Sequence, residues 1–459
     1  MADTKTLSRR ALPNVGFLRD LVRNVTARGR ELLPWPGRDD EDGRVPEPGA
    51  LAALCQRLLA ARGEVSSLTI AGELAAAYRR LDDAGRIAFL RLMATGFDAD
   101  AAAVREAFVA YDRAPTATTL HALARAAESS RQELFRRLNQ VAGGTATIVQ
   151  MRADLLRHLA VIEGGAAVDG DLAHLLASWF NRGFLVLQRI DWSSPAAILE
   201  KIIRYEAVHA IESWDDLRRR LAPVDRRCFA FFHPALVDEP LIFVEVALTD
   251  SVPGSIQALL ASEREAIDPQ RATTAVFYSI SNCQPGLRGI SFGNFLIKQV
   301  VDDLRRDLPR LSTFVTLSPL PGFRRWLEGD ATKVPTSALG EAAQRMREAL
   351  VQHDWATLPA TQRGDQSLRA LAAAYLLVGK DAKGRTIDRV ARFHLGNGAS
   401  VHDVHAMADV TAKGLRESAG VMVNYRYDLE AIEANHEAFA EHGTVSASNA
   451  VRRLAKDFI

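Results

Sequence analysis

The sequence has very little cysteine and almost no net charge. Its 459 residues include three cysteines, Cys55, Cys228 and Cys283, and the formal net charge is +1. The cysteines are far apart and form no C-x-x-C pair, which excludes a disulfide framework and a cysteine zinc knuckle. Because positive and negative charges nearly balance, no excess of basic charge argues for nucleic acid, and we expect no nucleic-acid partner.

Long apolar runs are also missing. No run reaches the roughly 18 residues that a membrane-spanning helix needs, so we expect no membrane span. Residues 1–32 lack the apolar core of a secretory signal; they are rich in arginine, as mitochondrial presequences are, but Asp3, Asp20 and Glu31 argue against that interpretation. A reducing compartment suits the free cysteines. We expect a cytoplasmic protein, or a mitochondrial one if the source is eukaryotic.

Residues 49–178 show the spacing of helices almost throughout. Leucines recur every three to four residues, and Gly143-Gly144 ends one of the segments. The proline-rich stretch before residue 49 is typical of a polar linker. We find no set of residues in this region that could carry chemistry. We therefore interpret 49–178 as a helical domain that supports oligomerisation or covers the active domain, preceded by an N-terminal segment and linker at 1–48.

The centre of the C-terminal half reads as strand, loop, helix and strand. Residues 274–281 are rich in β-formers, 282–293 contain glycines and a proline, 294–308 have the apolar repeat of a helix, and 313–317 form a second strand. A loop that opens a helix offers free backbone N–H groups and the positive end of the helix dipole, which suits phosphate. The fingerprints G-x-x-x-x-G-K-[ST] and G-x-G-x-x-G are absent. From the residues alone, a phosphate cradle and an ordinary strand–helix turn are both open interpretations.

The residues around this unit extend it to an α/β region at 179–459. Together with the helical domain it makes an α+β protein of two domains. The further elements that we expect are helices at 195–205, 215–221 and 255–265, strands at 227–233, 241–248, 388–394 and 421–427, and an insertion of two helices at about 328–384.

Several stretches resemble the malonyl-CoA decarboxylase family. They lie between about Ser178 and Asp428 and include FYSISNCQPGLRGISFGNFLIKQVV, TLSPLPGFRRWL, FHLGNGA and VMVNYRYD. The loop from Arg288 to Gly293 is also similar to the acyl-CoA loop R/Q-x-x-G-x-G/A of the GNAT acyltransferases, with Ser291 in place of the first glycine. The resemblance implies a GNAT-like catalytic domain at 179–459 and assembly into a homo-oligomer, a dimer or a tetramer.

The resemblance further implies a carboxy-lyase that converts malonyl-CoA to acetyl-CoA and CO2, as part of malonyl-CoA and fatty acid metabolism. This reaction needs no metal or biotin, because the thioester carbonyl accepts the electrons of the broken bond. We expect no cofactor besides the CoA thioester substrate. The enzyme must hold the carboxylate out of the thioester plane, hydrogen-bond the developing enolate oxygen and protonate the carbanion carbon.

Three residues match catalytic positions of the family. Ser318 follows the second strand, His394 ends a predicted strand, and Tyr427 lies in Asn-Tyr-Arg-Tyr. In a GNAT-like sheet the strand before Ser318 separates from its neighbour, and the thioester lies in the gap. We assign the proton transfer to His394, because an imidazole has an unperturbed pKa of about 6.5 and a serine hydroxyl is a poor acid by comparison. We expect Ser318 to polarise the thioester or to accept a proton. The resemblance implies that Tyr427 belongs to the site. From the residues alone, Ser318 is a turn residue, His394 a surface residue and Tyr427 a packing residue.

The resemblance also implies which loop contacts CoA. Its residues are Arg288, Gly289, Ile290, Ser291, Phe292, Gly293 and Asn294. Two rival functions use the same features. An acyl-CoA transferase would need an amine-acceptor site and usually a carboxylate base near the thioester. A non-catalytic regulatory protein would bind malonyl-CoA without converting it.

Two further histidines invite a metal-site interpretation. His402 and His405 lie close in the sequence to Asp403 and Asp409. Their spacing fits no standard helical pair of ligands, so we expect no metal site there. His209 lies in a stretch that matches the family, and the sequence provides no mechanism for it.

Overall fold

The computed structural model describes residues 48–290, 296–330, 337–352 and 354–458. These residues divide into two compact units. The first unit contains the described chain up to Phe180 and two short later segments, Pro234–Val237 and Gln284–Ile290. The second unit contains the rest.

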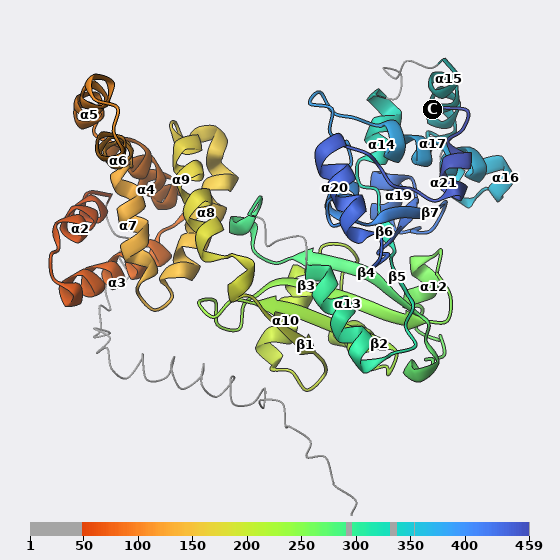
Figure 1. The fold of residues 1–459 in the computed structure, drawn as a ribbon. Coiled ribbons are helices and arrows are strands. Elements are labelled where there is room, and N and C mark those ends of the chain that lie inside the picture. The colour runs from red at the N-terminus through yellow and green to blue at the C-terminus, as the bar shows by residue number, and fades with distance from the viewer. Residues whose placement is uncertain (1–47, 291–295, 331–336, 353, 459) are drawn as a thin grey trace, which may run out of the picture. The chain divides into compact units, whose positions relative to one another are not determined.

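The first unit is built from helices (Figure 1). Local signals set the helix ends: the Asp82 carboxylate accepts a hydrogen bond from the Gly85 N–H at the start of α4, and Gly143 takes a φ of 72° before α8. The predicted helical character of this region is confirmed. Its elements are α2 (Pro48–Ala60), α3 (Glu64–Arg80), α4 (Asp83–Gly96), α5 (Ala101–Arg113), α6 (Ala117–Ala126), α7 (Ser130–Asn139), α8 (Gly144–His158), η1 (Leu159–Val161) and α9 (Gly165–Trp179).

A loop from the second half of the chain belongs to this helical unit. It contains the short helix η4 (Pro285–Leu287), which packs against α8. A Cβ on Gly286 would lie 1.9 Å from the Val149 carbonyl oxygen, so the close approach requires glycine. The buried Arg152 guanidinium donates hydrogen bonds to the carbonyls of Gly286 and Arg288, each at 2.8 Å. These contacts hold the start of the proposed CoA loop on the helical unit.

Within the described residues, the second unit contains one mixed sheet of eight strands in the order β1-β2-β3-β4-β5-β8-β6, with β7 paired to β8 (Figure 1). Neighbouring strands are antiparallel except β4 and β5, which are parallel. The strands are β1 (Val186–Ile190), β2 (Arg226–Phe232), β3 (Pro240–Thr249), β4 (Thr274–Asn282), β5 (Thr313–Thr316), β6 (Ser318–Pro319), β7 (Ser400–His405) and β8 (Met422–Arg426).

Helices flank and connect these strands. The strands predicted at 274–281 and 313–317 are confirmed as β4 and β5, and the described part of the helix predicted at 294–308 is α13. Residues 291–295 of the predicted loop and helix lie outside the described residues. Helix α12 is shorter than the helix predicted at 255–265. The helices are η2 (Arg182–Phe184), α10 (Ala196–Tyr205), α11 (Trp214–Leu221), α12 (Ile256–Leu260), η3 (Pro269–Arg271), α13 (Leu296–Asp307), α14 (Phe323–Arg325), η5 (Trp326–Asp330), α15 (Ser337–Leu350), η7 (Trp355–Thr357), α16 (Ala360–Arg363), α17 (Asp365–Val378), α18 (Arg389–Gly396), α19 (Ala412–Ser418), α20 (Ile432–His442) and α21 (Asn449–Leu454).

The strand predicted at 388–394 is wrong, because these residues begin helix α18. Asp388 caps the helix by accepting hydrogen bonds from two backbone N–H groups of its first turn. Ala391 and His394, three residues apart, are both buried, as expected for one face of a helix. The sheet resumes later than predicted, at β7, which the sequence analysis missed.

Strands β4 and β5 separate after four pairs of residues. The last pair is Phe277 with Thr316, and the Leu317 N–H then donates to the Phe277 carbonyl at 3.0 Å. Beyond this point β4 stays beside β3, whereas β6 pairs with β8. The expected separation of the two strands is therefore present, and Ser318 lies immediately after it.

The two faces of the sheet carry different side chains near this separation. One core cluster contains Val315, Leu317, Tyr278, Ala247 and Met422. Because side chains alternate along a strand, Thr316 and Ser318 point to the opposite face. Phe277 shares that face, since its ring contacts the Tyr427 ring with centroids 6.3 Å apart. We call the two sides the Ser318 face and the Tyr278 face.

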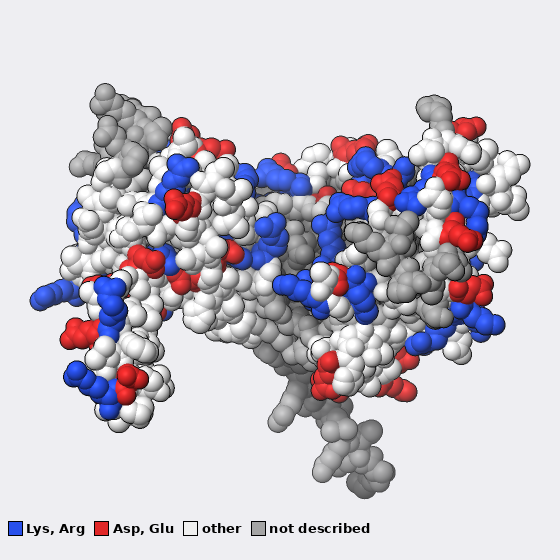
Figure 2. Space-filling model, turned by 90° about the horizontal axis from the view of Figure 1, so that it is seen from above, with Lys and Arg blue, Asp and Glu red and all other residues white. Residues whose placement is uncertain are grey.

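Acidic and basic side chains lie next to one another on the surface that Figure 2 shows. This mixture agrees with the whole sequence, which has 57 basic and 56 acidic residues. Along the described chain, no helix combines the length and apolar character needed to cross a membrane.

Candidate active site

The three candidate catalytic residues come together on the Ser318 face. Ser318 begins β6, His394 lies in the last turn of α18, and Tyr427 follows β8. The Ser318 Oγ lies 3.1 Å from His394 Nε2, and His394 Nδ1 lies 2.8 Å from the Tyr427 Oη. The side chains are 7%, 3% and 2% exposed. We call this hydrogen-bonded set the serine–histidine chain.

Its surroundings are aromatic rather than charged. The imidazole of His394 stacks on the Tyr425 ring, with ring centroids 4.6 Å apart. It contacts the Tyr427 ring edge-on, with centroids 6.1 Å apart. Burial lowers the pKa of His394 from 6.5 to about 3 and raises the pKa of Tyr427 well above 10. Both groups are therefore neutral at pH 7 with the site as described. The interpretation of His394 as a surface residue is wrong.

The backbone around the chain is held by the sheet. Ser318 pairs with Val423, and the Tyr427 N–H donates to the Phe314 carbonyl at 2.9 Å. Ser318 is thus a buried strand residue rather than a turn residue. The arrangement can pass a proton between the imidazole and either hydroxyl, because each is within hydrogen-bond distance of a ring nitrogen.

The loop expected to contact CoA is only partly described. Ser291, Phe292, Gly293 and Asn294 lie outside the described residues. Of the other three, Arg288 is exposed, Ile290 is buried, and Gly289 has a φ of 81°, which strains any other residue.

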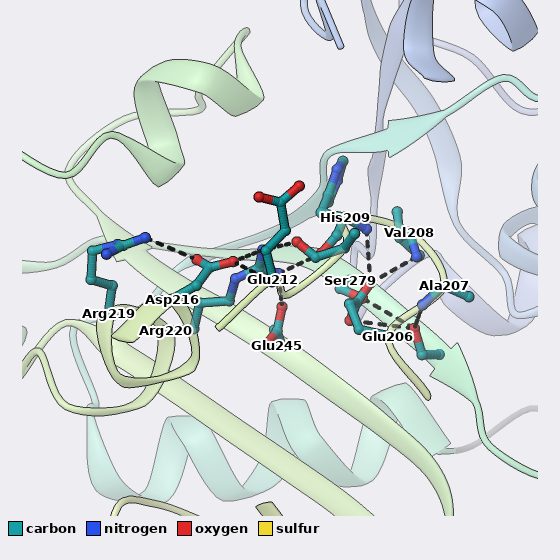
Figure 3. A network of polar contacts seen from close by, with 12 residues as sticks. Glu206, Ala207, Val208, His209, Glu212, Asp216, Arg219, Arg220, Glu245 and Ser279 are labelled. Carbon is teal, nitrogen blue, oxygen red and sulfur yellow. Dashed lines mark hydrogen bonds and ion pairs between the residues drawn. The ribbon is translucent and has the colours of Figure 1, made fainter. Parts of the chain in front are cut away.

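A second polar network lies on the Tyr278 face (Figure 3). Glu206 accepts hydrogen bonds from the backbone N–H groups of Val208 and His209 and from the Ser279 hydroxyl, the last at 2.7 Å. Arg220 donates to Glu245 Oε2 at 3.2 Å and to the His209 carbonyl at 2.8 Å. Glu245 pairs across the sheet with Ser279. It lies two residues before Ala247 in β3, so the two side chains share the Tyr278 face.

The pKa values of Glu245 and His209 in this network are strongly shifted from their usual values. Burial and the nearby Glu206 carboxylate raise the pKa of Glu245 to about 8, although Arg220 opposes the shift. Burial lowers the pKa of His209 to about 4. Among the described residues, four buried polar atoms in this region have no hydrogen-bond partner, namely His209 Nε2, Arg220 Nε, Glu245 Oε1 and Tyr278 Oη. We call Glu206, His209, Arg220, Glu245 and Ser279 the glutamate–arginine network.

Sequence reasoning noted only His209 of this network. One signal was available: Glu245 interrupts the apolar run LIFVEVAL at the centre of a strand. A carboxylate in such a run needs a buried partner, because its desolvation is costly. The partner Arg220 is 25 residues away in the sequence, so no local motif connects the two.

His405 and Asp403, which invited the metal-site interpretation, have other partners. His405 Nε2 lies 2.5 Å from Asn424 Oδ1, and Asp403 pairs with Arg369 at 3.2 Å. In the part of the chain that the structure describes, no group of three His, Cys, Asp or Glu side chains is arranged to hold a metal ion.

Family comparisons cover both units. The model of the malonyl-CoA decarboxylase C-terminal domain matches residues 183–458, and that of the malonyl-CoA decarboxylase N-terminal domain matches 97–180. Mitochondrial malonyl-CoA decarboxylases of Anser anser anser and Rattus norvegicus are both 36% identical over 349 residues. These matches cover 71% of this chain, 69% of the first relative and 71% of the second.

Solved structures agree with these matches. The crystal structure of malonyl-CoA decarboxylase from Rhodopseudomonas palustris is 52% identical, with a TM-score of 0.85 over 89% of this chain and 100% of that one. The enzyme from Agrobacterium vitis is 51% identical, with a TM-score of 0.81 over 88% of this chain and 99% of that one. The chain belongs to the malonyl-CoA decarboxylase family.

Proposed function

We propose that this protein converts malonyl-CoA to acetyl-CoA and CO2, with His394 as the proton donor. The observation that carries the proposal is the buried serine–histidine chain beside the separation of β4 and β5, in a member of this family. Its groups are those that the reaction needs, namely a hydroxyl that can reach an enolate oxygen and an imidazole that can protonate carbon.

The proton comes from solvent through His394. Malonyl-CoA brings a carboxylate, and a negative charge beside the imidazole raises its pKa from the value of about 3 that burial alone imposes. The imidazole then takes up one proton. The bond between the carboxylate and the α-carbon breaks, its electrons pass to the thioester carbonyl, and CO2 leaves. The imidazolium protonates the α-carbon of the enolate, so the reaction consumes one proton overall.

Ser318 is placed to stabilise the enolate. Its hydroxyl would donate to the thioester oxygen as negative charge develops there, or accept a proton during the transfer. We expect no acyl-serine intermediate, because the acetyl group stays on CoA throughout. Tyr427 holds the other nitrogen of the imidazole.

For CoA, we propose that the loop from Arg288 to Asn294 holds the pyrophosphate. The exposed Arg288 and the positive φ of Gly289 support this, because together they offer a cation and an unusual backbone turn. Gly289→Val should raise KM for malonyl-CoA, and Arg288→Ala should weaken binding more at low salt than at high salt. If free CoA does not compete with the substrate, this placement is wrong.

We propose that the helical unit supports a homo-oligomer, a dimer or a tetramer. Exposed apolar side chains on it, such as Val65, Phe108 and Leu120, provide surface for such contacts. A monomer in sedimentation at micromolar concentration would contradict this proposal.

For its location we propose the cytoplasm, or the mitochondrion in a eukaryotic source. All three cysteines are unpaired and buried, which suits a reducing compartment, and the curated relatives above are named as mitochondrial. Fractionation of the source cells would decide between the two compartments.

The central test is incubation of the purified protein with malonyl-CoA alone in D2O. We expect acetyl-CoA with one solvent deuterium in its methyl group. Product that forms only when an amine is added would instead identify an acyl-CoA transferase. Tight binding of malonyl-CoA without product would identify a regulatory protein.

A further inference from the structure

Thr316 lies two residues before Ser318 on the same face of the sheet. It is fully buried, and its Oγ1 accepts a hydrogen bond from the Ser318 hydroxyl at 2.9 Å. The same oxygen accepts a second hydrogen bond from the Tyr425 N–H at 3.2 Å. The Thr316 oxygen thus accepts twice, from the Ser318 hydroxyl and from a backbone N–H, which uses both of its lone pairs.

The hydrogen bond from Ser318 to Thr316 sets the direction of the other hydrogen bonds in the serine–histidine chain. A serine hydroxyl has one hydrogen, and in the structure Ser318 donates it to Thr316. Toward His394 Nε2, 3.1 Å away, the Ser318 oxygen must therefore accept, so Nε2 carries a hydrogen. A neutral imidazole has only one N–H, which leaves Nδ1 as the acceptor for the Tyr427 hydroxyl at 2.8 Å. To stabilise the enolate, the Ser318 hydroxyl would turn from Thr316 to the thioester oxygen once the substrate is bound.

The direction is opposite to that of a hydrolytic serine–histidine pair. In such a pair the serine hydrogen points at the imidazole, which then removes it and makes the oxygen a nucleophile. In this protein the imidazole donates and the serine accepts. Ser318 is therefore not activated for attack, and the nitrogen facing Ser318 is a proton donor, as protonation of an enolate requires.

We infer that Thr316 is a positioning residue for decarboxylation: its hydroxyl draws the Ser318 hydrogen away from His394 and so keeps the imidazole proton on Nε2. This inference rests on the function proposed above. Without the Thr316 hydroxyl, the nearest acceptor for the Ser318 hydrogen is Nε2. The neutral imidazole would then carry its proton on Nδ1, and the Nε2 lone pair would accept from Ser318. A proton would have to be loaded onto Nε2, against this hydrogen bond, before the imidazolium could protonate the carbon.

The test compares Thr316→Val, which removes the hydroxyl, with Thr316→Ser, which keeps it. Thr274→Val is a matched control, because Thr274 is also buried and lies at the far end of the β4–β5 pairing. The ring nitrogens of His394 are observed by NMR in protein labelled with 15N-histidine, and His394→Asn assigns their signals by difference. Steady-state kinetics with malonyl-CoA accompany the spectra.

We expect the Nε2–H tautomer in the wild type, in Thr316→Ser and in Thr274→Val, and the Nδ1–H tautomer in Thr316→Val. We also expect kcat to fall about 10-fold in Thr316→Val with KM unchanged, which is less than the loss of the proton donor itself. A purely structural role for Thr316 would not exchange the two nitrogen signals.

Two results would overturn the inference. One is an Nδ1–H tautomer in the wild type, which decides the matter even if Thr316→Val does not fold. The other is an active wild type whose tautomer and kcat are the same in Thr316→Val. A wild type that makes no acetyl-CoA would instead overturn the proposed function, and the spectra would still report the direction of the hydrogen bonds.

Discussion

Two buried polar clusters lie on opposite faces of one sheet, and they differ in how their polar atoms are satisfied. The serine–histidine chain is made of neutral groups that all have hydrogen-bond partners. The glutamate–arginine network contains the buried Arg220 guanidinium, and three of its buried polar atoms, His209 Nε2, Arg220 Nε and Glu245 Oε1, lack hydrogen-bond partners among the described residues. Perturbed pKa values alone do not separate the two, since both contain a histidine whose pKa burial has lowered. The serine–histidine chain differs because Ser318, His394 and Tyr427 form one continuous line of hydrogen bonds along which a proton can move.

The largest expected effect contrasts the two histidines. His394→Asn should fold, bind malonyl-CoA and lose roughly 10²–10⁴ in kcat, the usual range for one acid–base group. His209→Asn, on the other face, should keep its kcat. Steady-state rates with malonyl-CoA measure both. Wild-type turnover in His394→Asn would remove the histidine from the mechanism, and an equal loss in His209→Asn would erase the distinction between the clusters.

The two serines provide the next contrast. Ser318→Ala should lose on the order of 10²–10³ in kcat, as when one donor to an oxyanion is removed. Ser279→Ala should leave kcat unchanged and lower the free energy of unfolding by about 1 kcal/mol, because Glu206 loses one hydrogen bond. Kinetics and urea unfolding measure the pair. An acyl group trapped on Ser318 in mass spectrometry would refute the role given to its hydroxyl.

A smaller effect is expected from removing one tyrosine hydroxyl. Tyr427→Phe should lower kcat about 10-fold, because a neutral hydrogen bond contributes roughly 0.5–1.5 kcal/mol and the imidazole loses its partner at Nδ1. Tyr278→Phe is the matched change on the other face, where the buried hydroxyl has no partner among the described residues. It should not change kcat. Equal rates in the two variants would place Tyr427 among packing residues.

The smallest effect concerns stability and pH, where His394 and Glu245, one residue from each cluster, should respond in opposite directions. His394 has its pKa lowered from 6.5 to about 3, so the unfolded chain binds more protons between these values and stability falls as pH drops. Glu245 has its pKa raised from 4.5 to about 8, so the folded chain binds more protons there and stability falls as pH rises.

Urea unfolding between pH 4 and 8 would test this opposition. His394→Asn should reduce the loss of stability on the acid side, and Glu245→Gln the loss toward pH 8, by about 1 kcal/mol each. The wild type provides the reference curve. If Glu245→Gln is less stable than the wild type at pH 8, the carboxyl is ionised there and its pairing with Arg220 outweighs its burial.

Local pattern predicted much of the fold and little of the geometry of the site. The four-residue apolar repeat predicted α13, and β-formers predicted β4 and β5. The same reasoning wrongly assigned a strand to 388–394, because it overlooked the capping role of Asp388 at the start of α18. A short amphipathic helix and a strand are hard to distinguish over seven residues.

The site itself could be named but not assembled from the sequence. Ser318, His394 and Tyr427 were identified through a family resemblance, and their contacts depend on three elements that are distant in the chain. Thr316 carried no signal, since a threonine in a strand is ordinary. Its role follows only from which atoms its hydroxyl meets.

The loop held by Arg152 bears on how members of this family could be recombined. Residues Gln284–Ile290 are separated from the helical unit by more than a hundred residues of sequence, yet they pack as part of it. The helical unit is therefore not a portable module that ends at Phe180. A chimera that takes its helices from one relative and its sheet from another would bring together a foreign Arg152 position and a native Gly286 loop. Such exchanges should transplant the loop together with the helices.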